Sequence, residues 1–266
     1  MTIKTYSNII FETKDTYKAM ITINRPAMLN AIDYASLQEL KDALLKIQKS
    51  NDLRVFLITG SGMKSFVVGA DLKEMESNAR YPKKMKAFEE LGREVIGLID
   101  GLDIPSVCAI NGYALGLGLQ MALACTFRIA SLNAMFGLPE INMGFFPSMG
   151  ATQRLTRLIG EAKTMEMILT GETIEATEAY RIGLVNRIMS QVEFPAFVEK
   201  FVDGLAERSP IAMKLAISAI RRGKTMSLHD GLAYEAKLSE ECLRSEDLKE
   251  VKRALAEKRK PEFKNI

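Results

Sequence analysis

The chain has 266 residues, of which 47% are hydrophobic, so it is long and apolar enough to bury a large core. Its 36 basic and 33 acidic side chains leave a net charge of only +3, which argues against a nucleic-acid-binding protein. The longest apolar runs are interrupted by Asn and Gln, so we expect no membrane span. The first residues, "MTIKTYSNII", contain no continuous apolar stretch, so we expect no signal peptide and a cytoplasmic or equivalent reducing location.

The first part of the chain alternates short apolar segments with amphipathic ones. We predict strands over residues 18–24, 55–60 and 106–112, where apolar residues alternate or run together. Between these strands, residues 34–50 and 84–102 carry apolar residues at helical spacing. This alternation of strands and helices predicts an α/β core.

From about residue 193 onward, only helical patterns remain. We therefore predict a core over residues 1–192 and a C-terminal helical subdomain over residues 193–266. No Pro/Ser-rich linker separates the two parts, so we expect them to pack together.

Metal-ligating residue types are scarce in this sequence. The three cysteines lie far apart, and His229 is the only histidine. These residues define neither a disulfide framework nor a zinc-ligand cluster, and a single histidine excludes multi-histidine metal sites. No G-x-S-x-G motif precedes His229. If the protein is an enzyme, we expect a carboxylate to carry the proton and no metal to take part.

Residues 111–122, "NGYALGLGLQMA", are typical of a strand that turns through small residues into a helix. Such a turn directs backbone N–H groups at an anion. The G-x-G-x-x-G motif that binds dinucleotides is incomplete here, because Met121 stands at its third glycine. The sequence therefore argues against a dinucleotide as the ligand. Alternatively, Gly116 and Gly118 simply allow the helix to pack closely against the sheet. This stretch alone leaves both interpretations open.

A second turn of the same kind lies in residues 60–75, "GSGMKSFVVGADLKEM". It runs from a strand through Gly69 and Ala70 to a predicted helix start at Asp71. Two such turns can present two N–H donors to one oxygen, which is what stabilising an oxyanion requires.

Together, the two turns resemble the enoyl-CoA hydratase/isomerase family, also called the crotonase family. The resemblance covers nearly the whole chain, because four further segments follow in the family's order: "ITINRPAMLNAID", "FGLPEINMGFFPSMGATQRLTRLIG", "MEMILTGETIEATEAYRIGLVNRI" and "EKRKPEFK". It implies an α/β fold in which the core is a crotonase-like spiral of ββα units. It also implies that the C-terminal helices support homotrimers, which commonly pair into homohexamers.

The resemblance further implies an acyl-CoA thioester as the ligand and no cofactor beyond the CoA of the substrate. The backbone N–H groups of Ala70 and Leu117 fall at the oxyanion donors that hold the thioester oxygen. The contacts to CoA fall at four positions: Asp71, Leu72, Lys73 and Lys258. The position of Lys258 sometimes binds CoA across a subunit boundary.

Hydratases of this family place two glutamates at the substrate's double bond, at the positions of Gln120 and Glu140. This chain keeps only the second. An amide can orient water but has no useful basicity near neutral pH. The apolar neighbours of Glu140 could raise its pKa and make it a competent base. Without the resemblance, Glu140 would be interpreted as a surface or capping residue after Pro139.

A single carboxylate favours an isomerase, in which one glutamate moves a proton along a thioester enolate. We therefore expect a Δ3,Δ2-enoyl-CoA isomerase of fatty acid metabolism. The alternatives within the family are an enoyl-CoA hydratase in which Gln120 positions the water, and a specialised acyl-CoA hydrolase or lyase. From a different class, the chain could be a catalytically silent acyl-CoA-binding subunit.

Overall fold

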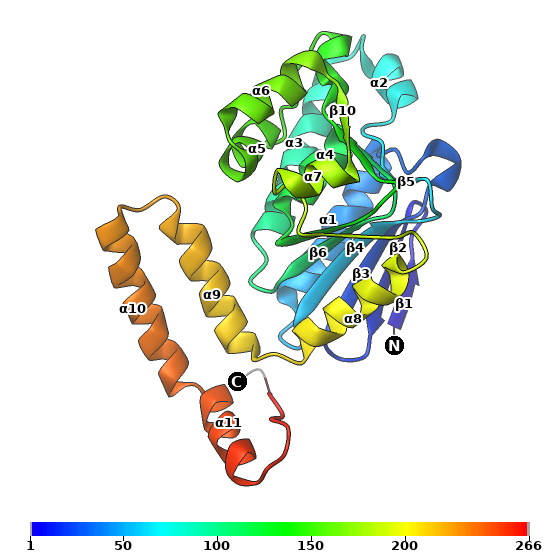
Figure 1. The fold of residues 1–266 in the computed structure, drawn as a ribbon. Helices are drawn as coiled ribbons and strands as arrows, with labels where there is room; N and C mark the ends of the chain where they lie inside the picture. The colour runs from blue at the N-terminus through cyan, green and yellow to red at the C-terminus, as the bar shows by residue number, and fades with distance from the viewer. Residues whose placement is uncertain (1, 265–266) are drawn as a thin grey trace.

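The computed structural model describes residues 2–264, which form two β-sheets covered by helices and a helical arm at the C-terminal end (Figure 1). Within these residues, the larger sheet has seven strands in the order β1-β2-β3-β4-β6-β8-β11. The pairings among β1, β2 and β3 are antiparallel, and those from β3 to β11 are parallel. These strands are β1 (Thr2–Thr5), β2 (Ile9–Lys14), β3 (Lys18–Ile23), β4 (Val55–Gly60), β6 (Ser106–Ile110), β8 (Phe127–Ser131) and β11 (Arg187–Met189).

The smaller sheet has the order β10-β9-β7-β5. Its strands are β5 (Ser65–Val67), β7 (Tyr113–Leu115), β9 (Met135–Gly137) and β10 (Thr173–Glu175). The chain passes from the larger sheet to the smaller one at β4–β5, β6–β7 and β8–β9, and each pair is followed by helices. The predicted spiral of ββα units is therefore confirmed.

The helices of the spiral occupy the connections between these strands. They are η1 (Pro26–Met28) and α1 (Tyr34–Lys49) before β4; α2 (Leu72–Asn78) and α3 (Pro82–Asp100) after β5; α4 (Leu117–Ala124) after β7; η2 (Pro139–Met143), α5 (Ala151–Ile159) and α6 (Glu161–Thr170) after β9; and α7 (Ala176–Arg181) after β10. The predicted strands correspond to β3, β4 and β6, and the two predicted helices to α1 and α3.

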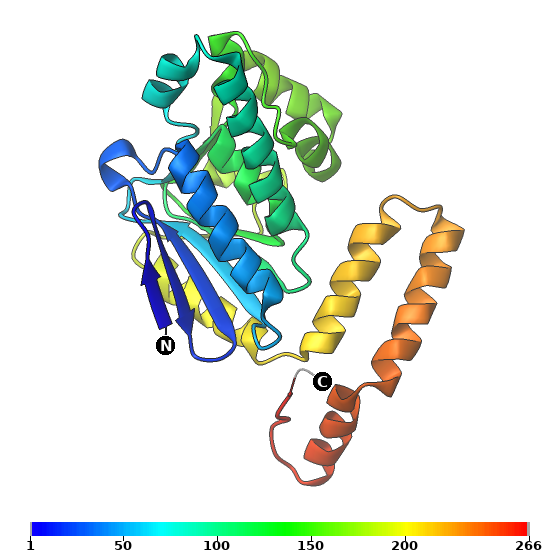
Figure 2. The ribbon, with the colours of Figure 1, turned by 180° about the vertical axis from the view of Figure 1, so that it is seen from behind.

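Alternate residues of the central strands pack against opposite layers of helices. In β4, Phe56 and Ile58 belong to the core that includes α1 and α3, whereas Val55 packs against α8 (Phe194–Ala206). Figures 1 and 2 show α8 on one face of the sheet and α1 with α3 on the other. Burial on both faces explains why these strands are nearly continuous apolar runs in the sequence.

After α8, the chain forms an arm of helices: α9 (Pro210–Gly223), α10 (Leu228–Arg244) and α11 (Glu246–Ala256). The arm contacts the core through Arg221 on α9, whose Nη1 donates to the carbonyl oxygen of Leu102 at 2.9 Å. Helix α8, the first helix after residue 193, packs on the sheet. The division of the chain at residue 193 stays a prediction. Among residues 2–264, no helix has the length and apolar character needed to cross a membrane.

The close packing of α4 on β5 requires Gly118. A Cβ atom at this position would lie 2.1 Å from the carbonyl oxygen of Val67 and 2.8 Å from its Cβ, so no side chain fits without movement of the backbone. The interpretation of Gly118 as a packing residue, drawn from the sequence as one alternative, therefore holds in the fold.

Gly118→Ala should destabilise the protein by about 1–3 kcal/mol, because the added methyl group overpacks the α4–β5 contact. Gly97→Ala is the matched control, since Gly97 lies exposed in α3 and its Cβ would have no neighbour within 4 Å. That variant should gain about 0.5–1 kcal/mol from helix propensity. Urea unfolding at one fixed protein concentration measures both changes, and equal stabilities would contradict the packing argument.

Candidate active site

A pocket of about 630 Å³ opens between the turns after β5 and β7 and the segment that runs from η2 to α5. Helix α3 supplies another part of its wall. Most of the lining side chains are apolar, as expected for a site that accommodates an acyl chain. They include Met28, Val68, Met85, Phe88, Met143, Phe145, Phe146 and Met149.

The two glycine turns touch each other at this pocket. A Cβ atom at Gly116 would lie 3.7 Å from the Cα atom of Gly69. Gly69 has a φ of 116° and Gly116 a φ of 50°, which are conformations that side chains rarely permit. The positions next to both glycines, Ala70 and Leu117, line the pocket.

The backbone N–H of Ala70 is oriented by a parallel bridge to Ile32. In this bridge, the N–H of Ile32 donates to the carbonyl of Gly69 at 2.9 Å, and the N–H of Asp71 donates to the carbonyl of Ile32 at 2.8 Å. The residue at the centre of such a bridge directs its own N–H and carbonyl to the opposite side. The N–H of Ala70 therefore points away from Ile32.

Leu117 supplies the second predicted donor as the first residue of α4. N–H groups in the first turn of a helix have no acceptor within that helix. In α4, the first hydrogen bond within the helix is made by Gln120, whose N–H donates to the carbonyl of Gly116 at 3.0 Å. The helix start also carries partial positive charge. The structure thus brings both predicted donors to one pocket.

Glu140 and Gln120 lie side by side in the wall of this pocket, and both are buried. Nε2 of Gln120 donates to Oε1 of Glu140 at 3.1 Å. The backbone N–H of Met149 donates to Oε1 of Gln120 at 2.8 Å. Because a backbone N–H can only donate, it fixes the amide so that its nitrogen faces Glu140. Within residues 2–264, Oε2 of Glu140 has no hydrogen-bond partner.

The pKa of Glu140 lies above its ordinary value of 4.5, because burial penalises the charged carboxylate. A backbone hydrogen bond and the hydrogen bond from Gln120 favour the charged form and offset part of this increase. A carboxyl group with a raised pKa is a stronger base once ionised. The structure therefore places one buried carboxylate, which can transfer a proton, beside two backbone N–H groups, which can stabilise an oxyanion.

The predicted CoA contacts lie in two places. Asp71, Leu72 and Lys73 line the pocket at the start of α2, where Leu72 is 60% exposed. The carboxylate of Asp71 accepts hydrogen bonds from the N–H groups of Lys73 and Glu74, so it caps α2. Lys258 follows α11 on the arm and is not among the residues that line this pocket. The assignment of these residues to CoA stays a prediction.

Two residues that hold the side chains of this site in place were not predicted from the sequence. Met149 orients Gln120 through its backbone N–H. A backbone contact of this kind does not depend on the residue type, so the sequence gives no signal for it. Arg25 forms ion pairs with Asp33 at 3.0 Å and with Asp71 at 2.9 Å. Arg25 and Asp33 both stand in the segment "ITINRPAMLNAID" that carried the family resemblance, but their pairing with Asp71 appears only in the fold.

Comparisons with known proteins agree with these features. The family model described as enoyl-CoA hydratase/isomerase matches residues 15–265. The chain is 40% identical to a short-chain-enoyl-CoA hydratase of Clostridium acetobutylicum, over 97% of this chain and 98% of that protein. It is 38% identical to a crotonyl-CoA hydratase of Syntrophomonas wolfei, over 97% and 98% respectively. A crystal structure of an enoyl-CoA hydratase from Bacillus anthracis matches with a TM-score of 0.94 and 35% identity, covering 98% of this chain and 100% of that one.

The raised pKa of Glu140 should make stability depend on pH in a defined direction. In the unfolded chain, Glu140 ionises near its ordinary pKa, whereas in the folded chain it ionises only at higher pH. The free energy of unfolding therefore decreases as the pH rises from the ordinary pKa to the raised one. Glu140→Gln removes this loss of stability, because the amide side chain does not ionise. The variant's stability relative to the wild type should therefore increase between pH 4 and pH 7, measured by urea unfolding.

Glu172→Gln is the control, since it removes one exposed carboxylate elsewhere on the chain. A stability difference between Glu140→Gln and the wild type that stays constant over this pH range would show that burial does not raise the pKa of Glu140.

Proposed function

This chain belongs to the enoyl-CoA hydratase/isomerase family, and we propose that it adds water across the double bond of a short-chain 2-enoyl-CoA. The observation that carries the proposal is the buried carboxylate of Glu140, held by Gln120 in the same pocket as the N–H groups of Ala70 and Leu117. Two similar proteins are described as hydratases, which favours hydration over the isomerisation that we expected from the sequence.

In this proposal, the thioester oxygen accepts hydrogen bonds from the N–H groups of Ala70 and Leu117. These donors stabilise the negative charge that the oxygen acquires when a nucleophile attacks the β-carbon. The start of α4 adds its partial positive charge to the Leu117 donor. The apolar lining of the pocket excludes bulk water, which strengthens both hydrogen bonds.

Glu140 moves the proton. Its carboxylate takes a proton from water while the water oxygen bonds to the β-carbon, and the π electrons shift to the thioester oxygen to form an enolate. Protonated Glu140 then gives the same proton to the α-carbon, and the enolate electrons form the new C–H bond. One carboxylate therefore suffices, and the reaction uses no cofactor beyond the CoA of the substrate.

Gln120 positions the reactants in this scheme. An amide nitrogen carries two hydrogens, and one of them is donated to Glu140. The second is available to the oxygen of the attacking water, and the N–H of Met149 keeps the amide in this orientation. The role of Gln120 is thus to hold water beside the base.

We extend the proposal to the contacts outside the pocket. Asp71, Leu72 and Lys73 would hold the nucleotide part of CoA at the start of α2, with Lys258 contributing from the arm. The arm also carries exposed apolar side chains, which favour a homotrimer or homohexamer that covers them. These side chains are Ile220, Leu228, Leu232, Leu243 and Leu255, all at least 56% exposed.

A Δ3,Δ2-enoyl-CoA isomerase is the second candidate, and the presence of one carboxylate instead of two favours it. Incubation with crotonyl-CoA and with 3-butenoyl-CoA separates the candidates by their products. A hydratase converts crotonyl-CoA into 3-hydroxybutyryl-CoA, whereas an isomerase converts 3-butenoyl-CoA into crotonyl-CoA. Binding of both thioesters without turnover would identify a catalytically silent subunit.

Glu140→Gln should lower kcat for crotonyl-CoA hydration by about 10²-fold or more, because it removes the base. Gln120→Ala should lower kcat less, since it removes positioning but leaves the carboxylate. Loss of crotonyl-CoA absorbance gives both rates, and Glu172→Gln serves as the control with unchanged kcat. If Glu140→Gln kept full activity while Gln120→Ala abolished it, the roles assigned to the two residues would be wrong.

Gln120→Glu restores a second carboxylate 20 residues before Glu140 in sequence and beside it in space. Two adjacent carboxylates share one proton, so their titration is coupled. Hydration should therefore increase over a limited pH interval, and kcat/KM should become bell-shaped between pH 5 and pH 9. Gln153→Glu makes the same charge change at an exposed position and should leave the wild-type profile. An identical profile in Gln120→Glu would contradict the coupling.

A further inference from the structure

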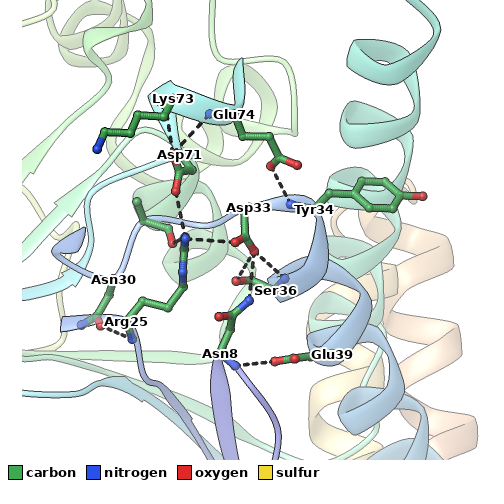
Figure 3. Close-up of polar contacts among 11 residues, drawn as sticks. Asn8, Arg25, Asn30, Asp33, Tyr34, Ser36, Glu39, Asp71, Lys73 and Glu74 are labelled. Carbon is green, nitrogen blue, oxygen red and sulfur yellow. Dashed lines mark hydrogen bonds and ion pairs between the residues drawn. The ribbon is translucent and has the colours of Figure 1, made fainter. Parts of the chain in front are cut away.

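Arg25 joins the N-terminal caps of two helices next to the pocket (Figure 3). Its Nη2 lies 3.0 Å from Oδ2 of Asp33 and 2.9 Å from Oδ2 of Asp71. Asp33 caps α1, because its Oδ1 accepts the N–H of Ser36 at 2.7 Å. Asp71 caps α2 with its own Oδ1. Each aspartate therefore uses one oxygen for a helix and the other for the same guanidinium nitrogen.

These contacts are well shielded. The side chains of Arg25, Asp33 and Asp71 are only 16%, 20% and 12% exposed. Burial would raise the pKa of Asp71, but the hydrogen bond from Arg25, the N–H groups of α2 and the guanidinium charge together hold it below its ordinary value. The guanidinium thus compensates two carboxylates that would otherwise face each other with little solvent between them.

The network is attached directly to the Ala70 donor. Asp71 is the next residue in the chain, and its N–H closes the bridge to Ile32 that orients the N–H of Ala70. Arg25 also binds the segment that carries Ile32, because Nη1 donates to the carbonyl of Ala31. Arg25 therefore holds both sides of this bridge, although it is not among the residues that line the pocket.

We propose that Arg25 is a positioning residue that directs the N–H of Ala70 at the thioester oxygen, an inference that rests on the proposed function of the pocket. Without Arg25, the two aspartates repel each other, and the segment that carries Ala70 separates from the segment that carries Ile32. The donor at Leu117 is unaffected, since it is fixed by α4. The loss therefore falls on one of the two hydrogen bonds to the oxyanion.

The test measures polarisation of a bound thioester as well as turnover. Cinnamoyl-CoA is the probe, because hydrogen bonds to its conjugated carbonyl shift its near-ultraviolet absorption to longer wavelength. In Arg25→Gln, this shift should shrink, and kcat for crotonyl-CoA should fall about 10–10²-fold, less than deletion of a whole donor costs. KM should change less than kcat, because the pocket walls remain.

Arg25→Lys keeps the charge but cannot reach both aspartates and the Ala31 carbonyl from one nitrogen in the same geometry. It should fold well and recover only part of the absorption shift. Arg54→Gln is the matched control, since Arg54 is a buried arginine that binds the carbonyls of Ala206 and Phe263, away from this network and from α4. It should lower the melting temperature and leave the shift of the folded protein unchanged.

The outcomes distinguish this inference from the proposed function. If Arg25→Gln and Arg25→Lys lowered the melting temperature but kept the wild-type absorption shift and kcat, Arg25 would be structural only. If the wild type polarised cinnamoyl-CoA without hydrating crotonyl-CoA, the hydratase proposal would fail, and loss of the shift in Arg25→Gln would still support the positioning role. A wild type that showed neither effect would overturn both.

Discussion

The geometry of the pocket depends on the two glycines at the start of α4, Gly116 and Gly118. Gly118 lets the helix lie against the backbone of Val67, and Gly116 lets the carboxylate of Glu140 approach the turn. A Cβ atom at Gly116 would lie 3.2 Å from Oε1 of Glu140, so a larger residue would press on the base itself. The turn that exposes the N–H of Leu117 therefore also sets its distance to Glu140. In a substrate, the thioester oxygen and the carbons that exchange the proton belong to one conjugated group, so this spacing must be held constant.

The electrostatics of Glu140 follow from the same close packing. Burial penalises the ionised carboxylate, and the amide of Gln120 supplies a hydrogen bond that partly compensates it. A second carboxylate in place of that amide would repel Glu140 unless the two shared a proton. The neutral amide instead supports ionisation of its neighbour. The backbone N–H of Met149 orients Gln120, and Gln120 donates to Glu140. The position of this N–H therefore influences the charge state of the proposed base.

The sequence predicts those parts of the fold whose signals are local. The strands at residues 55–60 and 106–112 are short apolar runs, and the helix at residues 34–50 has helical periodicity; the structure confirms all three. A strand was expected before each glycine turn, but a second sheet was not predicted, because strands such as β5 and β7 have three residues each and are too short for any periodicity. The two proposed N–H donors were assigned through the glycine turns and the family resemblance, and the fold places both at one pocket. The ion pair between Arg25 and Asp71 could not, because 46 residues separate its members and only folding brings them together.

The choice between hydration and isomerisation could not be settled from residue types, because both reactions pass through a negatively charged thioester enolate. The N–H donors and one carboxylate serve either reaction, so the products differ only in whether a water molecule is held beside the base. Gln120 bears on this point through its orientation. With its oxygen bound by the N–H of Met149 and one amide hydrogen on Glu140, it presents its remaining hydrogen to an acceptor. The β-carbon of an enoyl thioester offers no such acceptor, whereas a water oxygen does. The orientation of this amide, set by the backbone of Met149, is therefore consistent with the proposed hydration, and the residue type alone did not reveal it.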